Sequence, residues 1–213
     1  MNDVTQSIRE SYDRVAEEYA RRIFDELQHK PRERELLDRF AREVGQGEAC
    51  DLGCGPGQVA RYLRDTGVAV FGLDLSPGML EQARKLNPDI PFREGNMLSL
   101  DIPEGTLAGI AAFYAIVNLP PESLLLAFRE MQRVLAPGGL LLLAFHAGDE
   151  VIQENELWGH PISMEFRFFE PSEIRVQLET AGLGIEELIE REPYPEVEYQ
   201  SRRAYIFARK TRN

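Results

Sequence analysis

The sequence predicts an α/β protein in which a mostly parallel sheet carries helices on both faces. Between residues 48 and 147, short apolar segments alternate with helical segments five times. The fifth apolar segment, LLLLAFHA at 140–147, is apolar throughout, as a strand buried on both faces should be. The last two apolar segments, 184–192 and 202–210, follow each other without a helix, so we expect them to pair antiparallel.

Two helices are expected ahead of the sheet. Over residues 7–23, apolar and aromatic side chains recur at helical spacing. They are Ile8, Tyr12, Val15, Tyr19 and Ile23. A second helix is expected to open at Pro31 and to end at Gly45, because proline favours the first helical position and glycine the residue after the last.

Strands and helices then alternate along the chain. The expected strands lie at 48–52, 68–75, 106–117 and 140–147, and a short strand with its exit loop is expected within 90–97. The expected helices lie at 57–67, 76–86, 120–139 and 170–183. Ser76 and Pro77 form a typical helix start, and Pro137 to Gly139 are expected to end the third of these helices. Ser172 and its neighbours suggest a capping box at the start of the fourth.

Length and composition favour one domain over residues 1–213, with an N-terminal helical cap at 1–46 and an inserted segment at 147–170. The net charge of −12 argues against nucleic acid or an anionic membrane surface as the partner, since both require a basic surface. We expect the basic end of the chain, 201–213, to be a solvated strand end. The polar first residues and the lack of a long apolar run suggest a cytoplasmic protein.

The most informative stretch is ACDLGCGPGQVARYL, residues 49–63. A strand ends there in Asp51, and Gly53, Gly55 and Gly57 follow at alternate positions before a helix begins. Such a turn exposes backbone N–H groups at a helix N-terminus and lets a ligand approach closely. Because a second strand ends in Asp74 at a suitable distance, the pattern predicts a site for an adenosine-bearing ligand. The two cysteines, Cys50 and Cys54, are expected to be buried packing residues and not metal ligands.

These segments resemble the class I S-adenosylmethionine (SAM)-dependent methyltransferases, in particular the small-molecule enzymes of the UbiE or methyltransferase type 11 or 25 kind. The resemblance rests on six segments in the family's order. They are SYDRVAEEYA, ACDLGCGPGQVARYL, VFGLDLSPGMLEQAR, FREGNMLSLDIPEGTLAGIAAFYAIVNLP, FREMQRVLAPGGLLLLAF and FFEPSEIRVQLETAGL. It implies a Rossmann-like, doubly wound sheet of seven strands, mostly parallel, in which the last strand is antiparallel.

The resemblance also implies which residues bind SAM. The three glycines would pass under its methionine part, Asp51 would help to hold its ammonium group, and Asp74 would take the ribose hydroxyls. Apolar contacts to the adenine, a carbonyl at the exit of the fourth strand and a closing tyrosine would complete the site. These residues are Leu75, Met79, Asn96, Met97, Phe113 and Tyr19, with Tyr12 as a weaker candidate. Asn96 stands where the family often has aspartate, and the usual acid of the fourth strand is missing.

Simpler interpretations remain open for several of these residues. Asp51 could cap the following helix, Tyr12 and Tyr19 could be core residues, and Met79 could serve packing alone. Among the histidines, His146 at the end of the fifth strand is the candidate general base, because unperturbed histidine titrates near neutrality. A structural hydrogen bond is the alternative for His146. His29 and His160 are expected to be structural or solvated.

The implied reaction is in-line methyl transfer to a small organic acceptor, which depends on positioning and needs no metal. The segment 147–170 would form the acceptor side of the site, with an apolar, aromatic wall. The expected wall residues are Phe113, Tyr114, Trp158, Met164, Phe166 and Phe168. Arg167 could bind an acceptor carboxylate if it faced inward. Two other classes remain open, a non-catalytic SAM-binding regulator and an NAD(P)-dependent oxidoreductase. The sequence leaves the acceptor atom and the oligomeric state undetermined.

Overall fold

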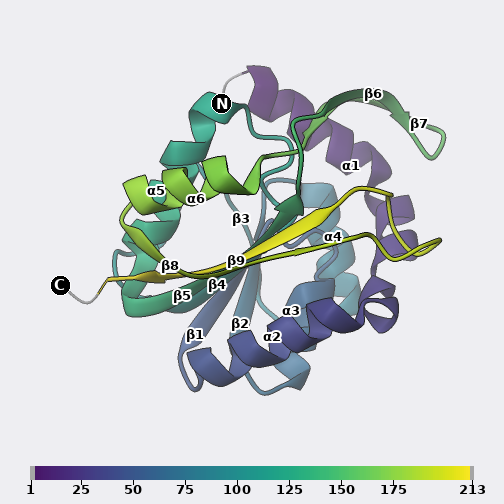
Figure 1. The fold of residues 1–213 in the computed structure, drawn as a ribbon. Helices are drawn as coiled ribbons and strands as arrows, with labels where there is room; N and C mark the ends of the chain where they lie inside the picture. Colours follow the sequence, from purple (N-terminus) through teal and green to yellow (C-terminus); the bar gives the residue numbers. More distant parts are fainter. Residues whose placement is uncertain (1–2, 212–213) are drawn as a thin grey trace.

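The computed structural model describes residues 3–211. Its main sheet has seven strands in the order β3-β2-β1-β4-β5-β9-β8, and a separate hairpin pairs β6 with β7 (Figure 1). The strands are β1 Glu48–Leu52, β2 Ala69–Asp74, β3 Phe92–Glu94, β4 Leu107–Phe113, β5 Leu135–His146, β6 Val151–Leu157, β7 His160–Arg167, β8 Leu183–Arg191 and β9 Arg203–Lys210. The helices are α1 Asp3–Ile23, α2 Pro31–Val44, α3 Gln58–Asp65, α4 Pro77–Leu86, α5 Pro121–Val134 and α6 Pro171–Thr180, with a 3₁₀ turn η1 at Glu26–His29.

The strand directions confirm the predicted fold class. The five strands from β1 to β5 pair in parallel, and β9 lies antiparallel between β5 and β8. The last strand of the chain is therefore the antiparallel one, as the resemblance implied. The short connection between β8 and β9 explains this direction, since a parallel crossover requires a longer segment, usually a helix.

Each face of the sheet has its own hydrophobic core, as β5 shows most clearly. Leu141, Leu143 and Phe145 point to the face that α5 and α6 cover (Figure 1). Leu140 and Leu142 point to the face that α2, α3 and α4 cover. Burial on both faces accounts for the unbroken apolar run in the sequence. It also fixes β5 as a rigid central strand, at whose carboxyl end His146 stands.

The helix ends follow the sequence in two places, and one helix start departs from it. The Ser76 side chain accepts from Met79 N at 3.0 Å and caps α4, as predicted. Gly45 ends α2 with a φ of 63°. The predicted capping box at Ser172 is wrong, because Pro171 begins α6 and Ser172 is already inside its first turn; no side chain caps this helix.

The boundary between α5 and β5 also differs from the prediction. The helix ends at Val134 and not at the glycines, and β5 begins at Leu135. A residue before proline disfavours the helical conformation, so Ala136 cannot continue the helix towards Pro137. The segment instead pairs with β4, where a shift in register interrupts the ladder. Within residues 3–211, no helix is long and apolar enough to cross a membrane.

Candidate active site

A cavity of about 400 Å³ opens at the carboxyl ends of β1, β2, β4 and β5. This is where parallel sheets of this type bind ligands. Helix α1 and the β6–β7 hairpin cover it, and η1 and the β8–β9 connection close its far end. Most of the SAM-binding residues expected from the sequence line it: Tyr19, Gly53, Gly55, Asp74, Leu75, Met79, Asn96, Met97 and Phe113. Tyr12 and His146 line it as well.

The three glycines of the loop all have a positive φ but meet different surroundings. A Cβ on Gly53 would lie 2.6 Å from the Ala115 side chain, and a Cβ on Gly57 would lie 2.8 Å from Phe92. Both glycines are therefore required by the protein's own packing. A Cβ on Gly55 would have only one neighbour within 4 Å, Tyr19 at 3.9 Å, and would project into the cavity. Of the three, Gly55 leaves room for a ligand.

Asp74 stands at the end of β2 and is fixed by two backbone groups. Its Oδ2 accepts from Gly55 N at 2.8 Å, and its Oδ1 accepts from Ser76 N at 2.9 Å. Burial raises the pKa of this carboxyl, and the charge of Asp13 adds to the effect, while the two N–H groups oppose them. The carboxyl group thus has a fixed orientation at the rim of the cavity, with oxygen lone pairs left for a ligand.

Asp51 lies beneath the glycine loop and does not line the cavity. Its Oδ2 accepts from Ala60 N at 2.8 Å in the first turn of α3, and the residue is 1% exposed. This is the capping role that the sequence left open. Burial raises the pKa of Asp51 to about 7. A contact to a ligand ammonium group stays a prediction for Asp51, as does any ligand contact for Gly57.

The adenine side of the predicted site is apolar, with one polar group already engaged. Leu75, Met79 and Met97 line the cavity, and Met79 is almost fully buried. The Asn96 amide oxygen accepts from Leu98 N at 2.9 Å. One lone pair of this oxygen remains for the predicted contact to an adenine amino group.

Helix α1 and the β6–β7 hairpin form a cover over the cavity. Asp13 joins the cover to the sheet, since its Oδ1 accepts from Ser76 Oγ at 2.6 Å and from Gly78 N at 2.8 Å. Tyr12 donates to Asn118 Oδ1 at 2.7 Å, and its ring meets Tyr19 at 6.1 Å. Burial raises the pKa of both tyrosines, so both remain protonated.

His146 stands among aromatic rings at the far end of the cavity. Its ring stacks on Phe168 at 4.9 Å and lies 5.0 Å from Tyr114 and 6.2 Å from Tyr199. Its Nδ1 lies 2.7 Å from Ser201 Oγ. Burial lowers the pKa of His146 to about 3, with further lowering by Arg203 and Lys30. The near-neutral pKa that made His146 a candidate base is therefore not retained in the fold.

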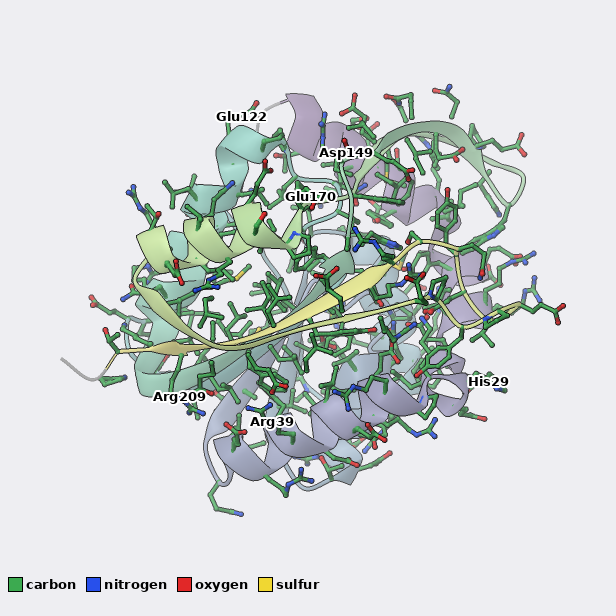
Figure 2. The ribbon with its side chains drawn as sticks, viewed as in Figure 1. His29, Arg39, Glu122, Asp149, Glu170 and Arg209 are labelled. Carbon is green, nitrogen blue, oxygen red and sulfur yellow. The ribbon has the colours of Figure 1, made fainter. Side chains whose placement is uncertain are left out.

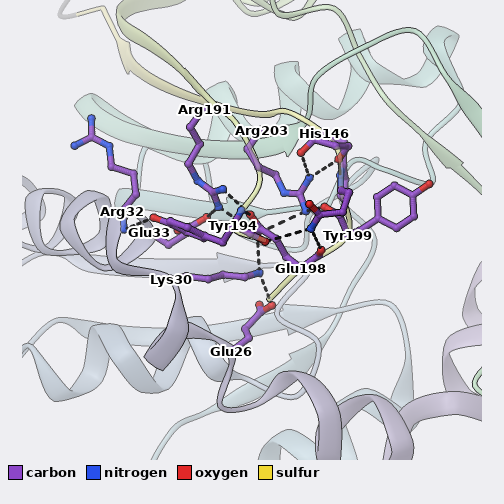
Figure 3. A network of polar contacts seen from close by, with 12 residues as sticks. Glu26, Lys30, Arg32, Glu33, His146, Arg191, Tyr194, Glu198, Tyr199 and Arg203 are labelled. Carbon is purple, nitrogen blue, oxygen red and sulfur yellow. Dashed lines mark hydrogen bonds and ion pairs between the residues drawn. The ribbon is translucent and has the colours of Figure 1, made fainter. Parts of the chain in front are cut away.

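A network of charged groups closes this end of the cavity, and sequence analysis did not identify it (Figure 3). Lys30 bonds Glu26 at 2.6 Å and lies 3.5 Å from Glu198. Arg191 binds both Glu198 and Glu33, and Arg203 lies 3.6 Å from Glu198. The members come from η1, α2, β8, β9 and the β8–β9 connection, which are far apart in the sequence.

Ion pairing sets the charge states in this network. Burial favours the neutral form of Glu198, but hydrogen bonds from Arg191 and Tyr194 N outweigh it and lower its pKa to about 2. Burial likewise opposes the charge of Lys30, but Glu26 outweighs it and raises the Lys30 pKa. Arg203 is 2% exposed, so the expectation of a fully solvated basic strand end is wrong for this residue. A basic residue of a terminal strand gives no sign in the sequence that it is buried.

The expected acceptor wall is mostly in place. Phe113, Tyr114, Trp158, Phe166 and Phe168 line the cavity. Met164 does not, because it packs under the hairpin with Val15 and Ile162. Arg167 pairs with Glu165 and does not line the cavity either.

The remaining histidines and Cys50 lie outside the cavity lining. His29, the last residue of η1, is exposed at the outer surface (Figure 2). His160 lies at the turn of the hairpin. Cys50 and Cys54 are buried free thiols, and Cys54 touches the cavity edge. Among the described residues, no group of histidine, cysteine and acidic side chains could hold a metal ion.

The fold and the cavity together define a Rossmann-like α/β protein with a ligand site at the carboxyl ends of its strands. A family model described as a methyltransferase domain matches residues 49–139. An uncharacterized methyltransferase of Synechocystis sp. is 32% identical over 148 residues, which make up 70% of this chain and 67% of that protein. The chain therefore belongs to the methyltransferase domain family.

Other relatives match over a smaller share of their own length. The malonyl-[acyl-carrier protein] O-methyltransferase of Enterobacter lignolyticus is 32% identical over 120 residues, which are 56% of this chain and 45% of that protein. The trans-aconitate 2-methyltransferase of Methylobacterium nodulans is 38% identical over 117 residues, 52% of this chain and 43% of that protein. The matches to these two relatives thus span a little less than half of their length.

Two solved structures show the same fold at low sequence identity. A SAM-dependent methyltransferase of Methanosarcina mazei has a TM-score of 0.72 at 16% identity, covering 79% of this chain and 94% of its own. The [4+2]-cyclase SpnF has a TM-score of 0.73 at 17% identity, covering 98% of this chain and 97% of its own. Because the second is described as a cyclase, the fold alone does not decide the reaction.

Proposed function

We propose that the protein is a SAM-dependent methyltransferase that acts on a small organic acceptor. The observation that carries the proposal is the pairing of Gly55 with Asp74. Gly55 leaves space at the loop where a side chain would fill the cavity, and its N–H fixes the Asp74 carboxylate beside that space. A carboxylate fixed at the end of the second strand suits the two hydroxyls of a ribose.

The residues that line the cavity fit SAM as the cofactor. Asp74 would hold the ribose, while Leu75, Met79 and Met97 offer apolar contacts to the adenine. Gly53 and Gly55 would lie against the amino acid part, and Tyr19 would close over it. SAM supplies an electrophilic methyl group on a positively charged sulfur. The protein's part is to exclude water and to hold the acceptor atom in line with that methyl group.

The acceptor would occupy the far end of the cavity, between the aromatic wall and the charged network. This end is lined by Tyr114, His146, Phe168 and Tyr199. Their rings meet at centroid distances between 4.9 and 6.2 Å, so they form one continuous aromatic wall beside the charged groups. Such a wall suits a small organic molecule with an apolar part. The name of one relative, trans-aconitate 2-methyltransferase, is compatible with a small organic acceptor.

Binding of S-adenosylhomocysteine (SAH), the demethylated product, tests the cofactor. SAH at 100 times its dissociation constant should stabilise the fold by about 2.7 kcal/mol, while NAD should have no effect. Asp74→Ala should weaken SAH binding by about 10-fold or more, because it removes a charge-assisted contact. Glu122→Ala, at an exposed position on α5, serves as the matched control. Stabilisation by NAD instead of SAH would show that the protein is an oxidoreductase.

Release of SAH from SAM in the presence of an acceptor library tests the reaction. A non-catalytic SAM-binding regulator shares the cofactor site, so binding alone cannot exclude it. Tight SAH binding without release for any acceptor in a broad library would favour the regulator. Release that depends on an added acceptor would establish an enzyme.

A further inference from the structure

The hydrogen bonds around His146 indicate which ring nitrogen carries the proton. The Arg203 Nη1 donates to Ser201 Oγ, and that same oxygen lies 2.7 Å from His146 Nδ1. Guanidinium groups can only donate, so Ser201 Oγ accepts from Arg203. Among the contacts of the described residues, His146 Nδ1 is the acceptor available to the Ser201 hydroxyl proton. This arrangement favours an unprotonated His146 Nδ1, with the proton of the neutral ring on Nε2.

The surroundings of His146 also oppose a second proton. Lys30 Nζ and Arg203 Cζ lie 5.7 and 5.6 Å from the centre of the Tyr114 ring. The His146 ring lies 5.0 Å from the same Tyr114 ring. Two cations therefore stand near a ring that burial already keeps neutral, and the pKa of His146 is lowered to about 3. A general base must accept a proton in the transition state, which this environment disfavours.

Several donors besides His146 line this part of the cavity, while its carboxylates are already paired. Tyr114 Oη and Arg203 Nε are buried without a hydrogen-bond partner among the described residues. The titratable groups around His146 are Tyr114 after β4, Lys30 before α2, and Glu198, Tyr199 and Arg203 from the β8–β9 connection and β9. Glu198 is held by Arg191 and by Tyr194 N, and Glu26 is held by Lys30 and Gln58. His146 Nε2 has no hydrogen-bond partner among the described residues, and its ring lines the cavity.

We propose that His146 is a hydrogen-bond donor that positions the acceptor through Nε2–H, and that the acceptor presents a carboxylate, which needs no base. The proposal rests on the proposed function, because it concerns the acceptor side of the same cavity. The new bond joins a carboxylate oxygen to the methyl carbon as the bond from that carbon to sulfur breaks. The electron pair of the broken bond stays on sulfur, both charges are neutralised, and no proton moves.

Nitrogen NMR of the ligand-free protein tests the tautomer directly. Correlation of ring nitrogens with ring carbon-bound protons in ¹⁵N-labelled protein distinguishes a protonated from an unprotonated nitrogen, and His146→Gln identifies the signals. We expect unprotonated Nδ1 and protonated Nε2, with no change between about pH 5 and 8. Ser201→Ala should shift the Nδ1 signal. A protonated Nδ1, or a titration near pH 6 to 7, would overturn the proposal.

Probe molecules test the carboxylate with the same signal. In the presence of SAH, benzoate and other small carboxylates are added, with benzyl alcohol and benzylamine as uncharged and cationic counterparts. Benzoate or another carboxylate of the panel should move the Nε2–H resonance, and the counterparts should not. If no carboxylate moves it, or if the alcohol or the amine moves it equally, the assignment of an oxyanion site is wrong.

Kinetics of variants separate a donor from a base once an acceptor is turned over. His146→Leu removes the donor and should lower kcat/KM by about 10- to 100-fold. His146→Gln keeps an N–H donor but no basic nitrogen, so it should recover most of that loss. The kcat/KM of the wild type should be flat between about pH 6 and 9. Equal loss in both variants, with a rate that rises with pH, would show that His146 is a base.

The two proposals fail in different experiments. Absence of SAH binding would contradict the methyltransferase but would leave the tautomer of the ligand-free protein measurable. A His146 that is protonated on Nδ1, in a protein that binds SAH and releases it in the presence of an acceptor, would contradict only the positioning role. Each result thus refers to one proposal.

Discussion

Gly53, Gly55 and Gly57 show that a single sequence pattern can serve several physical requirements. Each has a positive φ, at 71°, 50° and 87°, which favours glycine at all three positions. Only at Gly55 does the space beside the backbone belong to the cavity. The three positions look equivalent in the sequence. They differ in what a Cβ would contact, namely Ala115, Tyr19 or Phe92, and these residues lie elsewhere in the chain.

Alanine substitutions should separate ligand binding from folding at these positions. Gly55→Ala should lower the affinity for SAH by about 10-fold or more, since its methyl group would enter the cavity, at a cost of about 1 kcal/mol in stability. Gly57→Ala should lower stability more, because its Cβ would lie 2.8 Å from Phe92 and 2.9 Å from Asn87. Calorimetric titration with SAH and thermal unfolding measure the two effects. Unchanged SAH affinity in Gly55→Ala would contradict the assigned role of the loop.

The raised pKa of Asp51 predicts that the stability of the fold depends on pH. Its pKa is about 7 in the folded protein against an ordinary value of 3.8, because burial disfavours the charged form. A carboxyl with a raised pKa stabilises the fold below its unfolded pKa, and this contribution is lost as the pH rises through the folded pKa. Wild type should therefore gain stability relative to Asp51→Asn as the pH falls from about 7 to 4, by an amount on the order of a few kcal/mol.

Denaturant unfolding of the wild type and Asp51→Asn across this pH range measures the difference. Asparagine keeps an oxygen that can accept from Ala60 N, so the cap itself is conserved. The difference in unfolding free energy should level off below about pH 4 and above about pH 7. A difference that is constant over the whole range would mean that Asp51 is not buried as described.

The turn of the β6–β7 hairpin contains a residue that is unfavourable for its backbone conformation. Its turn consists of Trp158 and Gly159, with φ values of 51° and 85°, between the paired residues Leu157 and His160. Two residues with positive φ suit a tight hairpin turn, but asparagine and not tryptophan is the preferred first residue. The Trp158 ring lies 5.7 Å from Tyr19 and lines the cavity. The strained backbone therefore places an aromatic ring over the ligand site, a feature typical of functional positions.

Replacement of Trp158 should separate the backbone strain in the turn from the aromatic contact over the cavity. Trp158→Asn should relieve the turn and leave stability equal or higher, yet weaken SAH binding by about 2- to 10-fold, because the aromatic contact to Tyr19 is lost. Trp158→Phe keeps an aromatic ring and should retain most of the affinity. Thermal unfolding and SAH titration of the two variants make the comparison. If Trp158→Asn bound SAH as tightly as the wild type, the hairpin would not contribute to the cofactor site.

At the level of elements, the sequence predicted the sheet, the helical cap and the antiparallel end, because apolar periodicity reports which faces are buried. Boundaries were harder. The third strand was expected only as a short strand with its exit loop within residues 90–97, and β3 is Phe92–Glu94. Helix α5 ends at Val134, ahead of the Pro137 to Gly139 segment that was expected to close it. In both places pairing with a neighbouring strand decides the outcome, and a single segment of sequence does not contain that neighbour.

For the whole molecule, most residues that line the glycine-loop side and the aromatic wall of the cavity were predictable, and the charged network was not. The glycine loop and Asp74 are local patterns at the ends of consecutive strands. The charged network instead joins Glu33 to Arg191, which are 158 residues apart. Lys30, Glu198 and Arg203 meet there only because η1, β9 and the β8–β9 connection converge at one end of the sheet (Figure 3). Such a cluster follows from the topology, so a pattern along the chain cannot indicate it.

Substitution of Arg191 tests whether this network stabilises the fold as a whole. Its side chain is 12% exposed and binds Glu33 and Glu198, which are 1% and 3% exposed. Arg191→Met leaves both carboxylates without their main cation, and breaking a buried pair in this way costs about 3–5 kcal/mol. In a protein of this size, the melting temperature should fall by roughly 6–20 °C. The control is Arg175→Met, which removes an exposed pair with Glu179 and should change stability by about 1 kcal/mol at most. Equal effects of the two substitutions would mean that the network does not hold the β8–β9 connection against α2, and that its charges serve the cavity alone.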